Sequence, residues 1–205
     1  MSKILVLSPH TDDAEISCGG TIAKMKKLGN ELLCLSFSYA NISIPEDFPK
    51  ISTFLEYEKS MNLFGIEHLS FDYPTRYFPD HKQNILELLI KFKERFKPDI
   101  VLLPNSCDVH QDHQVIHQEG LRAFRNCSIF GYENIWNTIG KPNMSTYIPL
   151  TNEHIGKKME VIECYRSQIH KKPDLIDVVL SLAQVRGSEI GAKYAETFET
   201  IRSII

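Results

Sequence analysis

Residues 3–13 read KILVLSPHTDD, a short apolar run followed at once by a polar turn. The apolar run has the length and composition of a buried strand, and beyond a glycine pair Ile22 and Leu28 lie at helical spacing. The same order returns at residues 100–113, IVLLPNSCDVHQDH, where polar side chains follow the most apolar run of the chain. A strand that leads through a polar loop into a helix is the repeating unit of an α/β fold.

The rest of the chain continues this alternation. Strands are predicted at 3–7, 31–38, 68–71, 100–103 and 129–132, and helices at 22–28, 54–64, 83–96 and 113–125. Later segments include 147–149, helices at 153–168 and 175–186, and a final stretch at 197–205. We therefore predict a Rossmann-like, doubly wound and mostly parallel sheet flanked by helices in a single domain, residues 1–205. Residues 1–132 form its core and residues 133–205 complete it.

Composition narrows the class of protein. The 205 residues carry a formal net charge of -3, with acidic and basic side chains mixed along the chain, which argues against nucleic-acid or membrane-surface binding. The apolar run near the N-terminus is too short for a signal peptide or a membrane span, so we expect a cytoplasmic protein. The five cysteines are scattered without a Cys-x-x-Cys pair, a pattern typical of reduced thiols.

Side chains able to bind a metal follow the first and the fourth predicted strands. They are His10, Asp12, Asp13, His110, Asp112 and His113. In a doubly wound sheet these two strands are neighbours where the strand order reverses, and ligands bind at their carboxyl ends. The two groups should therefore meet in one crevice. Catalytic zinc takes three His or carboxylate ligands and keeps one position open, which leaves the other side chains free to move protons.

Each motif also has a simpler explanation when it is taken alone. Asp in a His-x-Asp-Asp turn is typical of a helix cap, and Glu15 in a first helical turn is stabilised by the macrodipole, although it could contact substrate. His117 lies one helical turn after His113, and we interpret it as a buried or supporting side chain. Arg76 follows the third strand and could bind an anionic group of a substrate.

Four segments together resemble a known family. SPHTDDAE at 8–15, Gly19-Gly20-Thr21, HQDH at 110–113 and YRSQ at 165–168 are similar to the signatures of the LmbE-like, PIG-L-type N-acetylglucosaminyl deacetylase family. The chain departs from the family pattern at Thr11, where Pro is usual, at Ala14, and at Asp108, where some members have Tyr.

The resemblance implies a reaction and a role for each residue. By position, His10, Asp13 and His113 correspond to the metal ligands of a Zn²⁺ site, which Fe²⁺ or another divalent metal could fill in a cell. The site would remove an N-acetyl group from an N-acetylglucosamine-type sugar or conjugate. Asp12 corresponds to the general base that activates the attacking water. A protonated His110 would stabilise the oxyanion, and Asp112 would orient His110. Either Asp12 or His110 would protonate the leaving amine.

Other properties follow only from the resemblance or remain open. The substrate would be a small acetylated sugar, and relatives of similar length suggest a homo-oligomer, a trimer or a hexamer. The alternatives are a metal-dependent hydrolase of another amide or of a phosphoester, because His and Asp around a metal serve those reactions equally well. A non-catalytic sugar-binding relative is a third possibility.

Overall fold

Strand β1 (Lys3–His10) lies inside the sheet and turns alternate side chains to its two faces. Leu5 and Leu7 join the apolar core on one face, whereas Ile4 and Val6 join the core on the other. This burial on both faces explains why the segment is an almost unbroken apolar run. The computed structural model describes residues 1–140 and 142–204.

The sheet confirms the predicted doubly wound, mostly parallel arrangement. Within the described residues it has seven strands in the order β3-β2-β1-β4-β5-β7-β6. Parallel to β1 run β2 (Glu31–Ser38), β3 (Glu67–Ser70), β4 (Ile100–Pro104) and β5 (Ser128–Tyr132). Strand β7 (Tyr194–Arg202) is antiparallel to β5, and β6 (Met144–Leu150) is antiparallel to β7. Strand order reverses between β1 and β4, which pair directly.

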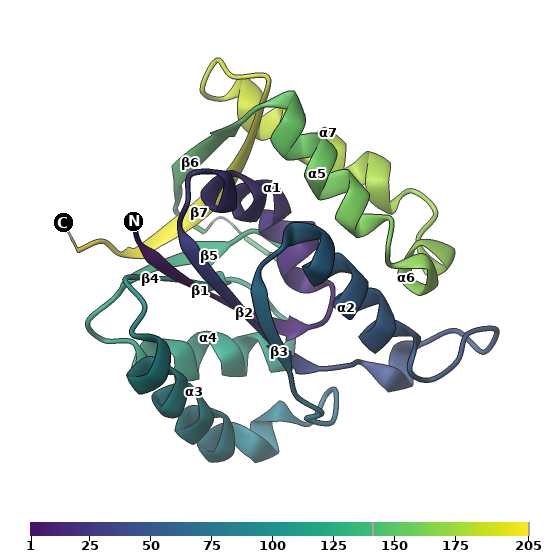
Figure 1. Ribbon diagram of the computed structural model, residues 1–205, viewed down its shortest axis with the longest axis vertical. Coiled ribbons are helices and arrows are strands. Elements are labelled where there is room, and N and C mark those ends of the chain that lie inside the picture. Colours follow the sequence, from purple (N-terminus) through teal and green to yellow (C-terminus); the bar gives the residue numbers. More distant parts are fainter. Residues whose placement is uncertain (141, 205) are drawn as a thin grey trace.

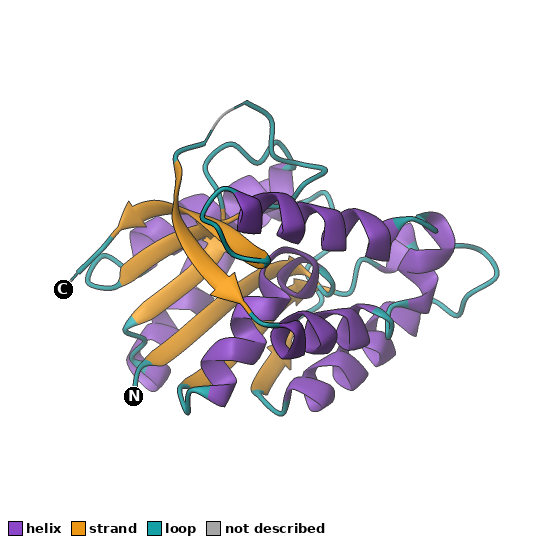
Figure 2. Ribbon diagram, turned by 90° about the horizontal axis from the view of Figure 1, so that it is seen from above, coloured by secondary structure: helices purple, strands orange, loops and turns teal. Residues whose placement is uncertain are grey.

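Helices cover both faces of the sheet (Figures 1 and 2). One face carries α3 (Lys82–Phe96) and α4 (Gln111–Ala123), which pack against each other. The other carries α1 (Asp13–Lys27), α2 (Ser52–Phe64) and α5 (Asn152–Ile162), with α7 (Leu175–Ser188) against β7. Short helical turns are η1 (Asn41–Ser43), η2 (Phe78–His81) and α6 (Arg166–Lys171). Strand β7 lies between β5 and β6, so part of the C-terminal third joins the sheet; the division at residue 132 stays a proposal.

Two predicted helices differ from the structure. The helix predicted at 153–168 is broken between α5 and α6, where Tyr165 leaves helical geometry and buries its side chain against the β1–α1 turn. Helix α1 begins at Asp13 rather than near Ile22, and Cys18 interrupts it with non-helical backbone angles. Of the final predicted stretch, residue 205 lies outside the described residues.

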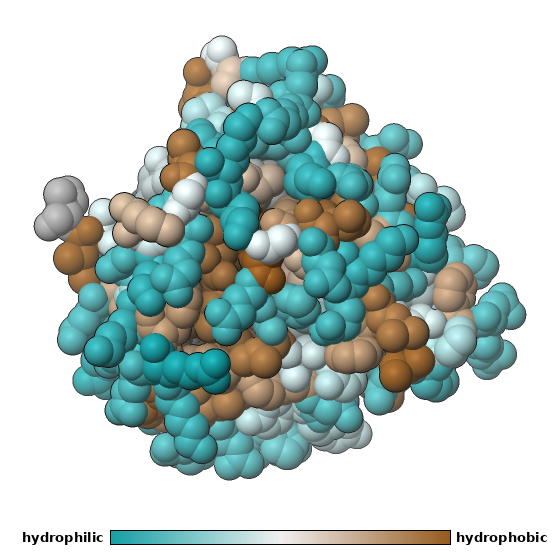
Figure 3. Space-filling model, in the orientation of Figure 1, coloured by the Kyte–Doolittle hydropathy of each residue, from teal (hydrophilic) through white to brown (hydrophobic). Residues whose placement is uncertain are grey.

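The cysteines, the surface and the helices add three observations. All five cysteines are free thiols, as predicted. Polar side chains dominate the face shown in Figure 3, with apolar patches between them. Among the described residues, no helix combines the length and the apolar character that crossing a membrane requires.

Candidate metal centre

The two polar loops meet because their strands are parallel neighbours. His10 is the last residue of β1, and His110 caps the N-terminus of α4 in the loop that follows β4. Since β1 and β4 pair side by side, both loops leave the sheet at the same edge. The structure thus brings together the metal-binding candidates from both motifs.

Three donor atoms converge on one point. Asp13 Oδ2 lies 3.1 Å from His10 Nδ1 and 3.1 Å from His113 Nε2. The two nitrogens lie 3.3 Å from each other. In a tetrahedral site with metal–ligand bonds of about 2.0–2.1 Å, neighbouring ligand atoms are separated by about 3.3 Å. The triangle has the size that a zinc-like cation requires.

The outer nitrogen of each ring faces a buried carboxylate. His10 Nε2 lies 3.0 Å from Asp112 Oδ2, and His113 Nδ1 lies 2.7 Å from Asp108 Oδ2. In a metal-bound site the ring protons would lie on these outer nitrogens, which turns both lone pairs inward toward Asp13. Three electron-pair donors then face one another, an arrangement suited to holding a cation.

The charge balance of the triangle agrees with this assignment. Burial opposes the charged form of His113, but the carboxylates of Asp13 and Asp108 raise the pKa of His113 to about 10. Burial likewise works against the Asp13 carboxylate, yet the imidazoles of His113 and His10 hold the pKa of Asp13 well below its ordinary value. A proton on His113 therefore supplies positive charge where a metal ion would otherwise supply it.

Two supporting residues were missed by the sequence analysis. Asp108 is buried and, besides orienting His113, accepts a hydrogen bond from the backbone N–H of His110 at 2.9 Å. Asn134 Nδ2 donates to Asp13 Oδ1 at 3.2 Å, which fixes the carboxylate oxygen that does not face the triangle. Asp108 had been noted only as a departure from the family pattern, and no local signal pointed to Asn134.

The carboxylate of Asp112 orients a different histidine from the one predicted. It contacts His10 Nε2 and accepts from the backbone N–H of Arg76 at 2.7 Å and of Phe78 at 3.3 Å. Its link to His110 is through the backbone, since the Asp112 N–H donates to His110 Nδ1 at 3.2 Å. The reason is geometric, because Asp112 lies in the first turn of α4 and faces β1 and the loop after β3.

His110 lies beside the triangle as a neutral side chain. Burial and the neighbouring imidazoles of His113 and His10 lower the pKa of His110 to about 4, so the predicted protonated form is not favoured near neutral pH. Because Nδ1 accepts from a backbone N–H, the neutral ring carries its proton on Nε2. His10, His110 and His113 also form a possible three-histidine set, with donor atoms within 4.8 Å. The Asp13 contacts are shorter, and we favour Asp13 as the third ligand.

Asp12 lies on the wall of a cavity next to the triangle. The cavity has a volume of about 130 Å³, room for several water molecules or a small acyl group, and Asp13 also lines it. Burial and the negative charge of Asp13 raise the pKa of Asp12. Within the described part of the chain, no other residue donates a hydrogen bond to its carboxylate. Its oxygens are free to take up a proton.

The structure contradicts one of the two predicted substrate contacts, Glu15, and leaves the other, Arg76, as a proposal. Glu15 is fully buried, and its Oε1 accepts from Ser60 Oγ at 2.7 Å and contacts the Tyr165 hydroxyl, so a direct substrate contact by Glu15 is wrong. Arg76 lies at the edge of the site in a left-handed conformation with φ 73°. Its side chain is exposed, and Arg76 stays a proposed substrate contact. His117 is half-buried and donates from Nδ1 to the Pro104 carbonyl at 2.7 Å; its supporting role at the metal site stays a prediction.

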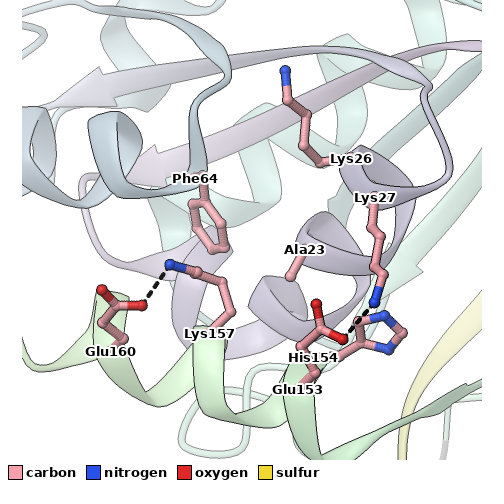
Figure 4. A pocket seen from close by; sticks show the side chains of 8 residues that line it. All are labelled: Ala23, Lys26, Lys27, Phe64, Glu153, His154, Lys157 and Glu160. Atoms are coloured by element: carbon pink, nitrogen blue, oxygen red, sulfur yellow. Dashed lines mark hydrogen bonds and ion pairs between the residues drawn. The ribbon is translucent and has the colours of Figure 1, made fainter.

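A larger surface hollow lies elsewhere, between α1 and α5 (Figure 4). Four of its five charged side chains form two ion pairs, Lys27 with Glu153 and Lys157 with Glu160, and the fifth, Lys26, is exposed. His154 takes part in the capping box at the start of α5. Because these groups already bind one another, the hollow lacks the unpaired, convergent groups of the triangle.

Comparison with known proteins agrees with the fold and the motifs. Residues 5–124 match the PIG-L family, described as GlcNAc-PI de-N-acetylase. Among solved structures, the conserved protein TT1542 from Thermus thermophilus is 21% identical, with a TM-score of 0.82; the match covers 100% of this chain and 97% of that chain. The N,N'-diacetylchitobiose deacetylase from Pyrococcus horikoshii is 22% identical, with a TM-score of 0.76 and coverage of 96% and 82%.

A third neighbour has a different activity. GalB, the 4-carboxy-2-hydroxymuconate hydratase from Pseudomonas putida KT2440, is 18% identical, with a TM-score of 0.82 and coverage of 100% of this chain and 98% of that chain. At these identities the structural likeness shows a shared fold and not a shared reaction.

Proposed function

The chain belongs to the PIG-L family, and we propose that it is a metal-dependent hydrolase that removes the N-acetyl group from an N-acetylglucosamine-type sugar or sugar conjugate. The observation that carries the proposal is the triangle of His10, Asp13 and His113 beside a free Asp12 carboxylate. Asp13, one of the proposed ligands, lines the same cavity as Asp12, the arrangement that supports metal-assisted amide hydrolysis.

His10 Nδ1, Asp13 Oδ2 and His113 Nε2 would hold the metal. Two imidazoles and one carboxylate suit Zn²⁺, and also Fe²⁺ or another divalent ion of similar size. A divalent metal bound there supplies Lewis-acid activation of a water molecule and of the amide carbonyl. The Asp108 and Asp112 carboxylates keep the two rings in the tautomer and orientation that binding needs.

Asp12 is the proposed proton carrier. Its raised pKa and free oxygens suit it to accept a proton from the attacking water. The departing nitrogen then needs a proton, and His110, with a pKa of about 4, has none to spare near neutral pH. Asp12 therefore serves both steps, first as base and then as acid.

His110 contributes a hydrogen bond rather than a charge. Its Nε2–H can donate to the oxygen that becomes negative when the amide carbonyl is attacked. The bond between its Nδ1 and the Asp112 N–H fixes the tautomer for this purpose. The ring keeps the same proton throughout the reaction.

The test is a panel of N-acetylated sugars and conjugates, incubated with the metal-loaded and the metal-free protein. The proposal predicts equal amounts of freed amine and acetate from at least one substrate, only with metal. Release of phosphate from phosphoesters without acetate would favour the phosphoesterase alternative, and hydration of an unsaturated acid would favour a GalB-like reaction. Tight sugar binding without turnover would favour a binding protein.

Two further properties stay proposals. We propose a cytoplasmic homo-oligomer, a trimer or a hexamer, by analogy with relatives of this length. Light scattering of the purified protein measures the oligomeric state, and cell fractionation measures the location; a monomer or a membrane-associated fraction would contradict them.

A further inference from the structure

Glu133, which directly follows β5, is bound by two side chains from the C-terminal third of the chain. Arg186 of α7 donates from Nε to Glu133 Oε2 at 2.9 Å and from Nη2 to Glu133 Oε1, so the two groups form a forked pair. Thr197 Oγ1, from β7, donates to Glu133 Oε2 at 2.9 Å. We call these three hydrogen bonds the Glu133 clamp. The clamp holds the chain at the point where it leaves β5.

The next residue, Asn134, bonds toward the proposed metal centre instead. Its Nδ2 donates to Asp13 Oδ1 at 3.2 Å, and Asn134 is buried. Its Oδ1 accepts from the backbone N–H of Trp136 at 3.2 Å, which supports the assignment of the amide nitrogen to the Asp13 side. One peptide bond therefore separates the Glu133 clamp from a hydrogen bond on a proposed metal ligand.

The loop that begins with these residues, 133–139, depends on polar contacts for its position. Burial of its large apolar side chains stabilises it little, because three of them are exposed: Ile135, Trp136 and Ile139. Near its far end the loop pairs with the segment after β4, where the Val109 N–H donates to the Asn137 carbonyl at 3.0 Å. The Glu133 clamp fixes the near end, next to Asn134.

Fastening α7 to the sheet is the simpler role for Arg186. Helix α7 already has an apolar face for that purpose, in which Val179 and Ala183 are buried in two apolar clusters. The 133–139 loop has its large apolar side chains exposed, so its position depends more on the forked pair than that of α7 does. The contact therefore acts mainly on the loop.

We propose that Arg186 and Glu133 are positioning residues for the metal centre: the Glu133 clamp fixes Asn134, and Asn134 fixes the Asp13 carboxylate for metal binding. The inference rests on the metal site of the proposed function. It gives the C-terminal third a role, because α7 and β7 would support a metal ligand without reaching the metal. Contacts of this kind to a metal ligand change metal affinity by about 10- to 100-fold.

The experiment measures binding of Co²⁺ to the metal-free protein, because the visible absorption of this ion depends on its coordination geometry. In Arg186→Gln the affinity should fall at least about fivefold, and the spectrum of the bound ion should change. Asn134→Ala should lower the affinity by about tenfold or more. Since both changes act on one carboxylate, adding Arg186→Gln to Asn134→Ala should cost less than about a further twofold.

Two more variants separate positioning from stability. Glu133→Gln breaks the forked pair from the other side and should lower the Co²⁺ affinity in the same way, which keeps the test valid if Arg186→Gln does not fold. Arg122→Gln is the matched control, because it breaks the ion pair with buried Glu119 in the last turn of α4. It should lower stability in urea denaturation and leave the Co²⁺ affinity and spectrum unchanged.

The possible results are distinct. Wild-type affinity and an unchanged spectrum in the folded Arg186→Gln or Glu133→Gln protein would overturn the inference. Losses that add in full in the double variant Asn134→Ala/Arg186→Gln would also overturn it, because Arg186 would then act by another route. The measurement needs no substrate, so it holds whichever bond the protein hydrolyses. If the wild-type protein binds no Co²⁺, the proposed metal centre fails, and the role of the Glu133 clamp fails with it.

Discussion

His10 Nδ1 lies 3.3 Å from His113 Nε2, although the two residues are 103 positions apart in the chain. The outer nitrogen of each ring is engaged by a carboxylate, so the two inner nitrogens face each other. The two lone pairs share Asp13 Oδ2 as their common neighbour. The parallel pairing of β1 with β4 creates the contact, and we propose that a metal ion stabilises it.

Metal binding should release protons. His113, with a pKa raised to about 10, is protonated in the metal-free protein at neutral pH and must lose that proton to bind a metal. The logarithm of the zinc affinity should therefore rise with pH between about 7 and 9 by at least one unit per pH unit. Calorimetry at several pH values measures the slope. His110→Gln is the control, since His110 is already neutral there, and a flat profile in the wild type would contradict the assignment.

Asp108 should control metal affinity without binding the metal. In Asp108→Asn the charge that orients His113 Nδ1 is lost, and the zinc affinity should fall about 10- to 100-fold. Competition with a chromophoric chelator measures it. Asp177→Asn, which alters an exposed carboxylate on α7, should leave the affinity unchanged. Wild-type affinity in Asp108→Asn would show that this contact does not support the site.

Tyr165 should position the β1–α1 turn. Its hydroxyl contacts both the Thr11 carbonyl and Glu15 Oε1 in the buried interior. Tyr165→Phe leaves the buried Thr11 carbonyl without this donor and Glu15 Oε1 with only Ser60, so the unfolding free energy should fall by about 1–3 kcal/mol. Because Thr11 lies between His10 and Asp12, kcat should also fall at least about tenfold.

Urea denaturation and kinetics at saturating metal measure the two effects of Tyr165→Phe. Tyr147→Phe is the matched control, because its hydroxyl donates to Glu189 at the surface, and it should change neither quantity appreciably. An intact kcat in Tyr165→Phe would limit this tyrosine to a structural role.

Removing only one partner of the ion pair between Lys158 and Glu196 should strongly destabilise the fold. Both side chains are buried, and Glu196 also accepts from the backbone N–H groups of Gly20 and Thr21, just after the interruption of α1 at Cys18. Lys158→Met leaves a buried carboxylate without its cation and should lower the unfolding free energy by about 3–5 kcal/mol.

Two further variants, Glu196→Gln and Lys157→Met, show whether the effect of Lys158→Met comes from its ion pair with Glu196. Adding Glu196→Gln removes the buried charge and should restore part of the loss, because the amide oxygen still accepts from one of the two backbone N–H groups, Gly20 or Thr21. Lys157→Met breaks the exposed pair with Glu160 and should cost less than about 1 kcal/mol. Equal effects of Lys157→Met and Lys158→Met in urea denaturation would contradict this account.

The sequence predicts the part of the site that depends on local features, namely the two strands and the polar loops that follow them. Apolar runs at residues 3–7 and 100–103 locate β1 and β4, and the rule that ligands bind where strand order reverses brings their loops together. That is sufficient to predict that His10 and His113 meet. The family resemblance adds the assignment of Asp13 as a ligand, which the short contacts favour.

The remaining contacts depend on packing between segments that are distant in the sequence, and local sequence patterns do not predict such packing. Asn134 reaches Asp13 across 121 positions, and Tyr165 reaches Thr11 across 154. The break between α5 and α6 is invisible to helical periodicity, because apolar spacing continues through it while the burial of Tyr165 bends the chain. The partner of Asp112 also depends on which face of α4 meets β1, and hence could not be predicted from residue spacing.

The central claim is that Asp12 performs catalysis at a metal centre held by other residues. The most direct measurement is acetate release from the best N-acetylated probe as zinc is added to metal-free wild-type protein and to Asp12→Asn. The account predicts activity that rises to about one equivalent of zinc in the wild type. It also predicts a kcat lower by about 10²–10⁴ in Asp12→Asn, with the same zinc content. Undiminished acetate release by Asp12→Asn, or by the metal-free wild type, would contradict it.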